Sequence, residues 1–215
     1  MQIMKLIIAN KRYSSWSMRP WLILKVKGIE FEEQLSAFDL ATNHSHFWDF
    51  SPTKKVPVLK HGKETVWDSL AIMEYLADLF PEKQLWPDDM IIRAHARSIA
   101  NEMHSGFMAL RNECPMNMCR TPSTIELSVD AVADIKRIEI IWADCLNQYG
   151  GPYLFGEFSI ADAMFAPVVN RLKIYQIPIS DCTKNYCAVI SELSAWQEWD
   201  RAAHDEPWVC ENVEI

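Results

Sequence analysis

The stretch Leu6-Ile7-Ile8-Ala9-Asn10-Lys11-Arg12-Tyr13-Ser14-Ser15-Trp16-Ser17-Met18-Arg19-Pro20-Trp21 decides how the fold begins. An apolar run is followed by a cluster of hydroxyls and then by a helix that can start at Pro20. A strand thus delivers hydroxyl groups to a helix N-terminus, where unpaired N–H groups and a partial positive charge stabilise an anion or a thiolate. The serines either serve a substrate or cap the helix, and this stretch alone leaves both interpretations open.

The first eighty residues or so alternate between strand and helix patterns. Strands are expected at residues 5–9, 29–35, 56–60 and 65–67, and helices at residues 20–27, ended by Gly28, and 69–80. Polar and aromatic residues fill an irregular stretch between the second and third strands. The order βαβ, irregular stretch, ββα predicts a mixed sheet with helices packed on it.

A change of pattern follows at residues 81–89, which carry two prolines and several charges and are typical of a linker. Beyond them, apolar residues recur at steps of three and four. This spacing predicts one long helix through residues 92–110, and further helices at 132–149, from Ser159 toward Ile174, and at 192–203. We therefore expect a first domain at residues 1–82, a linker at 83–89 and an all-helical bundle at 90–215.

Composition narrows the possible function. The chain has 215 residues and a net charge of −8, which argues against nucleic acid or an anionic membrane as a partner. No apolar stretch reaches the roughly 18 residues of a membrane span, and no signal peptide is recognisable, so we expect a cytoplasmic location. The six cysteines form no Cys-x-x-Cys pair and none precedes Cys114, so we expect no metal site and no thioredoxin-type redox pair.

Three local sequences carry a resemblance to the cytosolic glutathione transferases: Val56-Pro57-Val58-Leu59, Trp67-Asp68-Ser69-Leu70-Ala71-Ile72, and Gly156-Glu157-Phe158-Ser159-Ile160-Ala161-Asp162. The similarity extends over essentially the whole chain. It implies an α/β plus all-α fold, with an N-terminal thioredoxin-like domain of order βαβαββα followed by an all-helical substrate-binding domain. It also implies glutathione as co-substrate, a small electrophilic second substrate and a homodimer.

Each motif has its own implication. In the family the bond before the first motif's proline, here Pro57, is cis, and the backbone of Val56 pairs with glutathione like an added strand. Ser69 would hold the glutamyl carboxylate of glutathione and Asp68 its ammonium, although Ser69 also fits a plain helix N-cap. Ser159 and Asp162 form a capping box with a purely structural role.

The hydroxyl cluster supplies the expected chemistry. Ser14-Ser15-Trp16-Ser17-Met18-Arg19 resembles the Ser-Ser-Cys-x-x-Arg run of zeta-class transferases, whose first serine is catalytic, so the resemblance assigns the glutathione thiolate to Ser14. Ser15 and Ser17 are then interpreted as N-caps, Arg19 as a charge that orients the loop, and Tyr13 is the alternative hydroxyl. Ser15 and Trp16 are also expected beside glutathione.

The residue at position 16 departs from the family pattern. Trp16 stands where the zeta class has cysteine, which argues against maleylacetoacetate isomerase, the zeta activity, and against cysteine-dependent thiol exchange. A non-catalytic ligand-binding or protein-binding role is the main alternative to a transferase, and a glutathione-dependent isomerase is the other.

The remaining contacts come from cations and from the first bundle helix. Lys55 is favoured over Lys54, His44 and His46 for the glycine carboxylate of glutathione. For the second substrate we expect four residues along one helix: Met103, His104, Phe107 and Arg111. Because His104 and Arg111 are two helical turns apart, they would share a face and favour a polar or anionic substrate.

Overall fold

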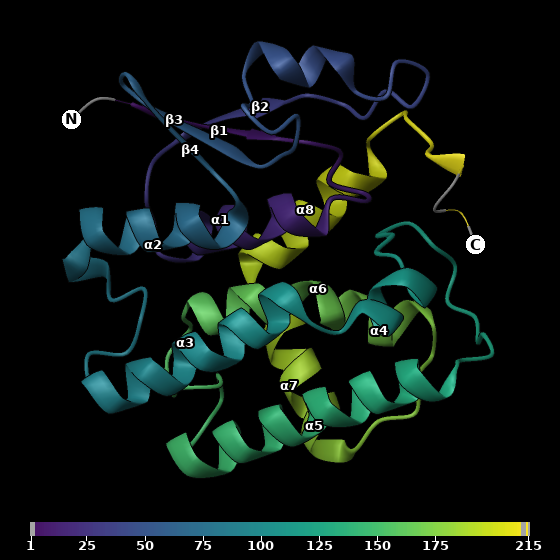
Figure 1. The fold of residues 1–215 in the computed structure, drawn as a ribbon. Coiled ribbons are helices and arrows are strands. Elements are labelled where there is room, and N and C mark those ends of the chain that lie inside the picture. The colour runs from purple at the N-terminus through teal and green to yellow at the C-terminus, as the bar shows by residue number, and fades with distance from the viewer. Residues whose placement is uncertain (1–2, 212–213, 215) are drawn as a thin grey trace.

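A four-stranded sheet forms the core of the first part of the computed structural model, which describes residues 3–211 and 214 (Figure 1). The strands are β1 (Met4–Ile8), β2 (Glu32–Leu35), β3 (Val58–His61) and β4 (Glu64–Trp67), in the spatial order β2-β1-β3-β4. β1 pairs in parallel with β2 and antiparallel with β3, so that Ile7 lies opposite Gln34 on one side and Val58 on the other. This mixed sheet matches the expected order, with each strand shifted by a few residues.

Two helices pack between the sheet and the rest of the molecule: α1 (Ser15–Val26) and α2 (Ser69–Leu79). The helical element expected between the second and third strands is only the short 3₁₀ helix η1 (Ser45–Asp49), which lies on the opposite side of the sheet. The fold class predicted from the sequence, a thioredoxin-like domain followed by a helical bundle, is confirmed.

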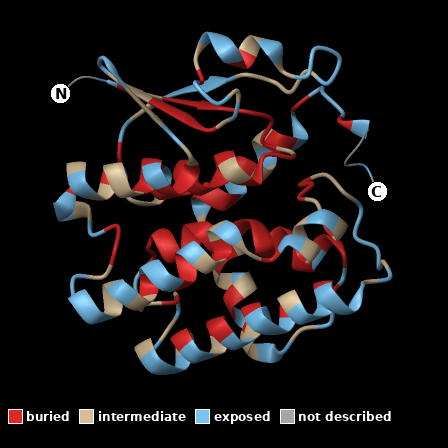
Figure 2. Cartoon of the chain, viewed as in Figure 1, coloured by how far each residue is buried: buried red, intermediate tan, exposed pale blue. Residues whose placement is uncertain are grey.

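In its described residues the second part consists of helices and connecting loops, with two isolated β-bridges between residues 153 and 157 and no strand. After the 3₁₀ turn η2 (Pro81–Lys83) come α3 (Met90–Ser105), α4 (Met108–Glu113), α5 (Val129–Tyr149), α6 (Ile160–Ile174), α7 (Asp181–Glu192) and α8 (Ser194–His204). Every residue of α6 except Lys173 is buried, because this helix lies between α1 and the other bundle helices (Figure 2). None of the helices described is long and apolar enough to span a bilayer.

The predicted capping box begins α6. The Asp162 carboxylate accepts from the Ser159 N–H at 2.9 Å, and the Ser159 side chain caps the third helical residue in return. Asp162 also accepts from the Leu154 N–H at 3.0 Å and from the Tyr186 hydroxyl at 2.9 Å. The box therefore ties the start of the central helix to two other segments of the bundle.

The start of α1 differs from the prediction. The helix begins at Ser15 rather than at Pro20, because the Ser14 side chain accepts from the Ser17 N–H and acts as the N-cap. Pro20 lies inside the helix. Proline at the first helical position is a preference, and here the hydroxyl cap overrides it.

The predicted long helix is interrupted. It divides into α3 and α4 at Gly106 and Phe107, and Phe107 has a positive φ of 59°. A Cβ on Gly106 would lie 2.8 Å from the Glu102 carbonyl oxygen, so glycine makes the sharp turn possible. The apolar spacing continues through the break, which is why the sequence pattern did not show it.

One bundle helix was missed. α7 is capped by Ser180, whose side chain accepts from the Thr183 N–H, and it buries only Thr183, Tyr186 and Ile190. The sparse apolar face hid the helix from periodicity, but the Ser180-Asp181 pair was a usable N-terminal signal.

Candidate functional site

A cavity of about 590 Å³ opens where the N-termini of α1 and α2 meet the start of β3. It is lined by the loop before α1 and its first residues, by parts of the segment between β2 and β3, and by the β4–α2 junction: Tyr13, Ser14, Ser15, Trp16, Phe38, His44, Phe47, Thr53, Lys54, Lys55, Val56, Pro57, Trp67, Asp68 and Ser69. All eight residues expected to hold glutathione or its thiolate lie on this one cavity. We call it the N-terminal cavity.

Ser14 holds the first turn of α1 in place. Its hydroxyl donates to the Ser17 Oγ at 2.7 Å and accepts from the Ser17 N–H at 3.3 Å. The Ser17 Oγ in turn accepts from the buried Ala9 N–H at 3.2 Å. The prediction that Ser15 and Ser17 are the N-caps is therefore wrong, because Ser14 itself is the N-cap and Ser17 links that cap to the end of β1.

Ser15, also interpreted as a cap, is not one. No residue in the described part of the chain hydrogen-bonds its hydroxyl, and the side chain lines the cavity. Because it occupies the first position of α1, its hydroxyl lies beside the free N–H groups of the helix. Ser14 and Ser15 thus both present oxygen atoms at the positive end of the α1 dipole.

Tyr13, the alternative hydroxyl, is engaged elsewhere. Its OH donates to the Glu214 carboxylate at 2.5 Å and accepts from the Cys210 N–H at 3.2 Å. Burial and the Glu214 contact raise the pKa of Tyr13 above its usual range, and a raised pKa disfavours tyrosinate.

The C-terminal segment also fixes the loop that leads to Ser14. The Glu206 carboxylate accepts from the Lys11 N–H at 2.6 Å and the Arg12 N–H at 3.2 Å, and the Trp199 indole N–H donates to the Lys11 carbonyl at 2.9 Å. The position of the hydroxyl cluster therefore depends on residues nearly two hundred positions away, which local sequence patterns do not reveal.

At the start of α2 the N-cap is not Ser69, as the plain N-cap interpretation has it, but the residue before it. The cap is Asp68, whose Oδ1 accepts from the Leu70 N–H at 2.9 Å and the Ala71 N–H at 3.3 Å. Its φ of 74° is unusual for a residue with a side chain and is typical of a functional position. The Ser69 Oγ is buried, has no partner in the described chain and lines the cavity, so it is available to a ligand.

The Val56–Pro57 peptide bond is cis, as the resemblance implied. Among the described residues, none hydrogen-bonds the backbone N–H or carbonyl of Val56, although β3 begins only two residues later. An unpaired backbone at a cavity wall can accept an extended peptide as an extra strand.

Cationic groups from the segment before β3 line the cavity. Lys54 and Lys55 both reach the cavity, whereas His46 does not line it. His44 lines the cavity too, but its Nδ1 accepts from the Asp39 N–H at 2.9 Å. Burial and the nearby Lys54 charge lower the pKa of His44, so that it is neutral near pH 7 and the two lysines carry the charge.

The residues expected at the second substrate separate into two pairs. His104 and Arg111 both contact Trp16: the His104 ring meets the indole edge-on with centroids 5.2 Å apart, and the Arg111 Cζ lies 5.2 Å from the indole centroid. They converge although the helix between them is broken, so the reasoning from one shared face was wrong. Met103 is fully buried and Phe107 nearly so, and neither lines the N-terminal cavity.

His104 also connects the bundle to the start of α2. Its Nε2 lies 3.5 Å from the second carboxylate oxygen of Asp68, while its Nδ1 is buried without a partner in the described chain. Burial lowers the pKa of His104, and the Asp68 carboxylate opposes this effect. The two parts of the molecule thus meet directly beside the cavity.

Burial raises the pKa of five of the six cysteine thiols, those of Cys114, Cys119, Cys145, Cys187 and Cys210. All six are free, and the pKa rises to about 11 for Cys114 and to about 12 for Cys145 and Cys187. A raised pKa keeps a thiol protonated and unreactive. Within the described residues no group of three or more metal-binding side chains gathers.

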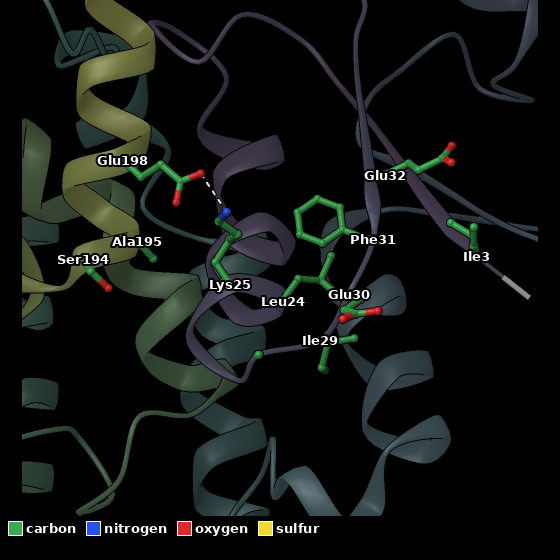
Figure 3. Close-up of a pocket in the computed structure, with 11 residues that line it drawn as sticks. Ile3, Leu24, Lys25, Ile29, Glu30, Phe31, Glu32, Ser194, Ala195 and Glu198 are labelled. Carbon is green, nitrogen blue, oxygen red and sulfur yellow. Dashed lines mark ion pairs between the residues drawn. The ribbon is translucent and has the colours of Figure 1, made fainter. Parts of the chain in front are cut away.

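A second cavity, of about 750 Å³, lies between the end of α1, the start of β2 and the start of α8 (Figure 3). Lys25 and Glu198 bridge it with an ion pair of 2.7 Å, and apolar side chains such as Leu24 and Phe31 form much of the wall. The cluster of hydroxyls at the N-terminus of α1 belongs to the other cavity, which makes the N-terminal cavity the candidate site.

Several cavity residues were not predicted from the sequence. Phe38, Phe47 and Thr53 come from the irregular segment between β2 and β3, and Trp67 was quoted only as part of a motif. The aromatic run near residue 47 was visible, but its position relative to α1 depends on the tertiary fold.

Comparison with known proteins agrees with this geometry. Residues 13–79 match the family model of the glutathione S-transferase N-terminal domain. Glutathione S-transferase 1 of Dianthus caryophyllus is 34% identical over 162 residues, covering 73% of this chain and 72% of that protein. Maleylacetoacetate isomerase of Rattus norvegicus is 29% identical over 187 residues and covers 84% of each chain.

A solved structure extends the similarity to the whole fold. The crystal structure of a glutathione transferase homologue from Burkholderia, with bound glutathione, superposes with a TM-score of 0.70 at 25% identity, covering 96% of this chain and all of that one. The match therefore includes both the sheet and the helical bundle. The chain belongs to the glutathione S-transferase family.

Proposed function

We propose that glutathione binds in the N-terminal cavity and that the Ser14 hydroxyl stabilises its thiolate, which then attacks a small electrophile. The chain is accordingly a glutathione transferase. The observation that carries this proposal is that two helix N-termini, those of α1 and α2, open into one cavity and each brings a hydroxyl to it. Two positive helix ends suit a ligand that has an anionic sulfur and a carboxylate.

The tripeptide has a natural orientation in this cavity. Its glutamyl carboxylate meets the unpartnered Ser69 hydroxyl at the start of α2, and its ammonium meets Asp68. The cysteinyl backbone pairs with the free backbone of Val56, which Pro57 follows in cis, and the glycine carboxylate reaches Lys55, with Lys54 beside it. The sulfur then points to the start of α1, where Ser14, Ser15 and Trp16 lie.

A serine hydroxyl can supply the free energy that is needed to lower the pKa of the glutathione thiol. A free thiol has a pKa of about 8.5, and lowering it by two units requires about 2.7 kcal/mol of preference for the thiolate. A hydrogen bond to a charged group contributes about 1.5–3 kcal/mol, and the α1 dipole can add to it. One serine hydroxyl at the helix start is therefore sufficient, without a metal.

Ser14 can donate its O–H hydrogen bond to the thiolate sulfur, because the Ser14 and Ser17 hydroxyls can rotate. It now donates to the Ser17 Oγ, and reversing the pair, so that Ser17 donates to Ser14, frees the Ser14 O–H while retaining the 2.7 Å contact. Ser15, whose hydroxyl has no partner in the described chain, is the alternative donor, and only a matched pair of variants separates the two.

Ultraviolet difference titration of bound glutathione tests the proposal. We expect a lowered thiol pKa in the native protein, a rise of one to two units in Ser14→Ala, and little change in Ser15→Ala. A native value near that of free glutathione would reject the transferase reading and favour a non-catalytic role. A rise confined to Ser15→Ala would move the role to Ser15.

A glutathione-dependent isomerase is a second candidate, because relatives named maleylacetoacetate isomerase cover most of the chain. The thiolate would add to a conjugated double bond, the resulting single bond would rotate, and elimination would return glutathione. Trp16 in place of the zeta-class cysteine weighs against it. Incubating the protein with glutathione and a cis enone distinguishes the two, since an isomerase yields the trans isomer without consuming glutathione.

The same proposal includes the domain boundaries, the oligomeric state and the location of the protein. Residues 1–82 form the glutathione-binding domain, 83–89 the linker and 90–215 the domain that contributes His104 and Arg111 toward the second substrate. The protein acts as a homodimer in the cytoplasm, as its family membership suggests. Light scattering of the purified protein measures the dimer directly.

A further inference from the structure

Three arginines lie near enough to influence one another where α1 meets the bundle, and two of them contact Trp16. Arg19 comes from α1, Arg111 from α4 and Arg171 from α6. The Arg19 Cζ lies 4.5 Å from the Trp16 ring centroid and the Arg111 Cζ 5.2 Å from it. Burial lowers the pKa of Arg19, and the positive charges of Arg111 and Arg171 lower it further.

The two deeper arginines are buried with donors unused. Arg19 has no exposed surface, and its Nε donates to the Met164 carbonyl at 3.1 Å while neither terminal nitrogen has a partner in the described chain. Arg171 is 4% exposed, and its Nε donates to the Cys114 carbonyl at 2.8 Å while its Nη1 has no partner there. A buried guanidinium normally uses these donors on a carboxylate.

No carboxylate of the described residues forms an ion pair with these three arginines. Asp68 is near enough to favour the charge on Arg19, but it already caps α2 and faces His104. Asp134 favours the charge on Arg111 and accepts from the Leu110 N–H at 3.1 Å.

A buried positive charge that the nearby carboxylates offset only in part attracts an anion. Arginine stays protonated in proteins, so burial leaves the charge in place. In a low-dielectric interior the field of such charges extends much further than in water and concentrates anionic ligands near the opening. The opening lies at Arg111, which is partly exposed and whose Nη1 has no recorded hydrogen bond in the described chain.

We propose that this arginine cluster is an anion site and that it selects an electrophile carrying a carboxylate or a similar anionic group. The anionic group contacts Arg111 beside Trp16, and Arg19 and Arg171 act on it from beneath through their field. The location follows from Trp16, which lines the N-terminal cavity on one side and contacts Arg111 on the other. The inference rests on the proposed function for the electrophile, but anion binding itself does not.

A pair of electrophiles that differ in charge tests the substrate class. In 4-chloro-3-nitrobenzoate and 4-chloro-3-nitrobenzamide, the thiolate attacks the ring carbon that bears chlorine, a C–S bond forms and chloride leaves. After division by the uncatalysed rates with glutathione, we expect kcat/KM to favour the benzoate by about tenfold, the size of one charge-assisted hydrogen bond. Equal corrected rates in the native protein would overturn the proposal.

Variants locate the effect. Arg111→Met should abolish the preference, Arg111→Lys should retain part of it, and Arg137→Met should leave it unchanged. Arg137 is the matched control because it removes the same charge from the bundle surface, where it pairs with Glu102 at 2.7 Å. An unchanged preference in Arg111→Met would reject the site. If that variant does not fold, the native protein still decides, since added salt must reduce the benzoate rate and spare the benzamide rate.

Binding without glutathione separates this inference from the proposed function. Quenching of tryptophan fluorescence by benzoate, benzamide and inorganic phosphate measures anion binding whether or not the bound thiol has a lowered pKa. Benzoate should bind about tenfold more tightly than benzamide and lose this advantage in Arg111→Met. Phosphate binding that benzoate does not displace would show an inorganic anion in the cluster and overturn the selection of an organic substrate.

Discussion

Two serine-capped helices, α1 and α6, pack against each other and have opposite surroundings at their starts. The cap of α6 is closed: the Asp162 carboxylate receives four donors, from the Ser159 N–H and hydroxyl, the Leu154 N–H and the Tyr186 hydroxyl. The cap of α1 is open: Ser14 holds the helix with one hydroxyl while Ser15 beside it faces the cavity with no partner in the described chain.

The difference shows what separates a structural helix start from a functional one. Both use the same residue type, but α6 supplies its own anion in Asp162, which occupies the positive end of the helix. No acidic residue stands in the first turn of α1, so its positive end is left for a ligand. The buried, hydroxyl-rich start of α1, which lacks an acid, is therefore the helix start that we propose as an anion site.

Removing the carboxylate that closes α6 should have the largest effect. Asp162→Ala leaves several buried donors unsatisfied, and we expect a loss of about 3–5 kcal/mol in the free energy of unfolding. Urea denaturation followed by circular dichroism measures it. The control Asp130→Ala, in the exposed first turn of α5, should cost under about 1 kcal/mol. Similar losses in both variants would contradict the contrast between closed and open caps.

At the start of α1, removing a hydroxyl should reduce the free energy of unfolding by less than Asp162→Ala does. Ser17→Ala removes the acceptor of the buried Ala9 N–H and the partner of Ser14, and we expect a loss of about 1–3 kcal/mol. Thermal unfolding measures the loss, and Ser98→Ala, on the exposed side of α3, is the control and should stay within about 0.5 kcal/mol of the native protein. Because Ser14 retains its own hydroxyl, the thiol pKa of bound glutathione should rise less in Ser17→Ala than in Ser14→Ala.

The start of α2 stands between these extremes, since it has an acid in Asp68 and, in Ser69, a hydroxyl that no described residue hydrogen-bonds. Asn caps helices about as well as Asp, so Asp68→Asn should change the unfolding free energy by less than about 1 kcal/mol. It removes the charge facing the glutathione ammonium, so KM for glutathione should rise about tenfold. Steady-state kinetics measures this, with Asp68→Ala as the variant that loses both cap and charge. An unchanged KM in both variants would remove Asp68 from the glutathione site.

The smallest expected effect concerns pH. Because burial lowers the pKa of His104 in the folded protein, the unfolded chain, with a histidine pKa near 6.5, takes up its proton first as the pH falls. Stability attributable to this residue is therefore present above about pH 6.5 and is lost as the pH falls toward the folded value. Arg19 and Arg111 act in the same direction, and Asp68 opposes them.

His104→Gln should therefore show a shallower loss of stability on acidification. The measurement is the urea midpoint at several values between about pH 7.5 and 5, compared with the native protein. A steeper acid loss in the variant would mean that the Asp68 contact, and not burial, controls the titration.

The sequence was sufficient for the features with a local cause. The strand expected at residues 5–9 and the capping box at Ser159 each have a short motif, and the structure has the strand at Met4–Ile8 and the box where it was expected. The cis bond before Pro57 is also present, but only the family resemblance implied it. The order of sheet and bundle followed from the change of periodicity at the prolines near residue 81.

Features with a long-range cause could not be read in this way. The break at Gly106 lies inside an uninterrupted apolar pattern, and α7 has too few buried residues to be periodic. Glu206 fixes the loop before Ser14 from the other end of the chain, and Arg171 reaches the arginine cluster only because α6 packs on α1. The choice between Ser14 and Ser15 depends on one hydroxyl contact with Ser17, which no pattern encodes.

The contact between Tyr13 and Glu214 has a practical consequence for protein engineering. The loop that begins α1 is held by the backbone at Cys210 and by the side chain of Glu214, while β1 starts at the other end of the sheet (Figure 1). A fusion tag placed after Glu214 joins the chain next to the residue that holds Tyr13, whereas a tag placed before β1 joins it away from this contact. Immobilisation on a surface should therefore be through the N-terminal side whenever activity is to be preserved.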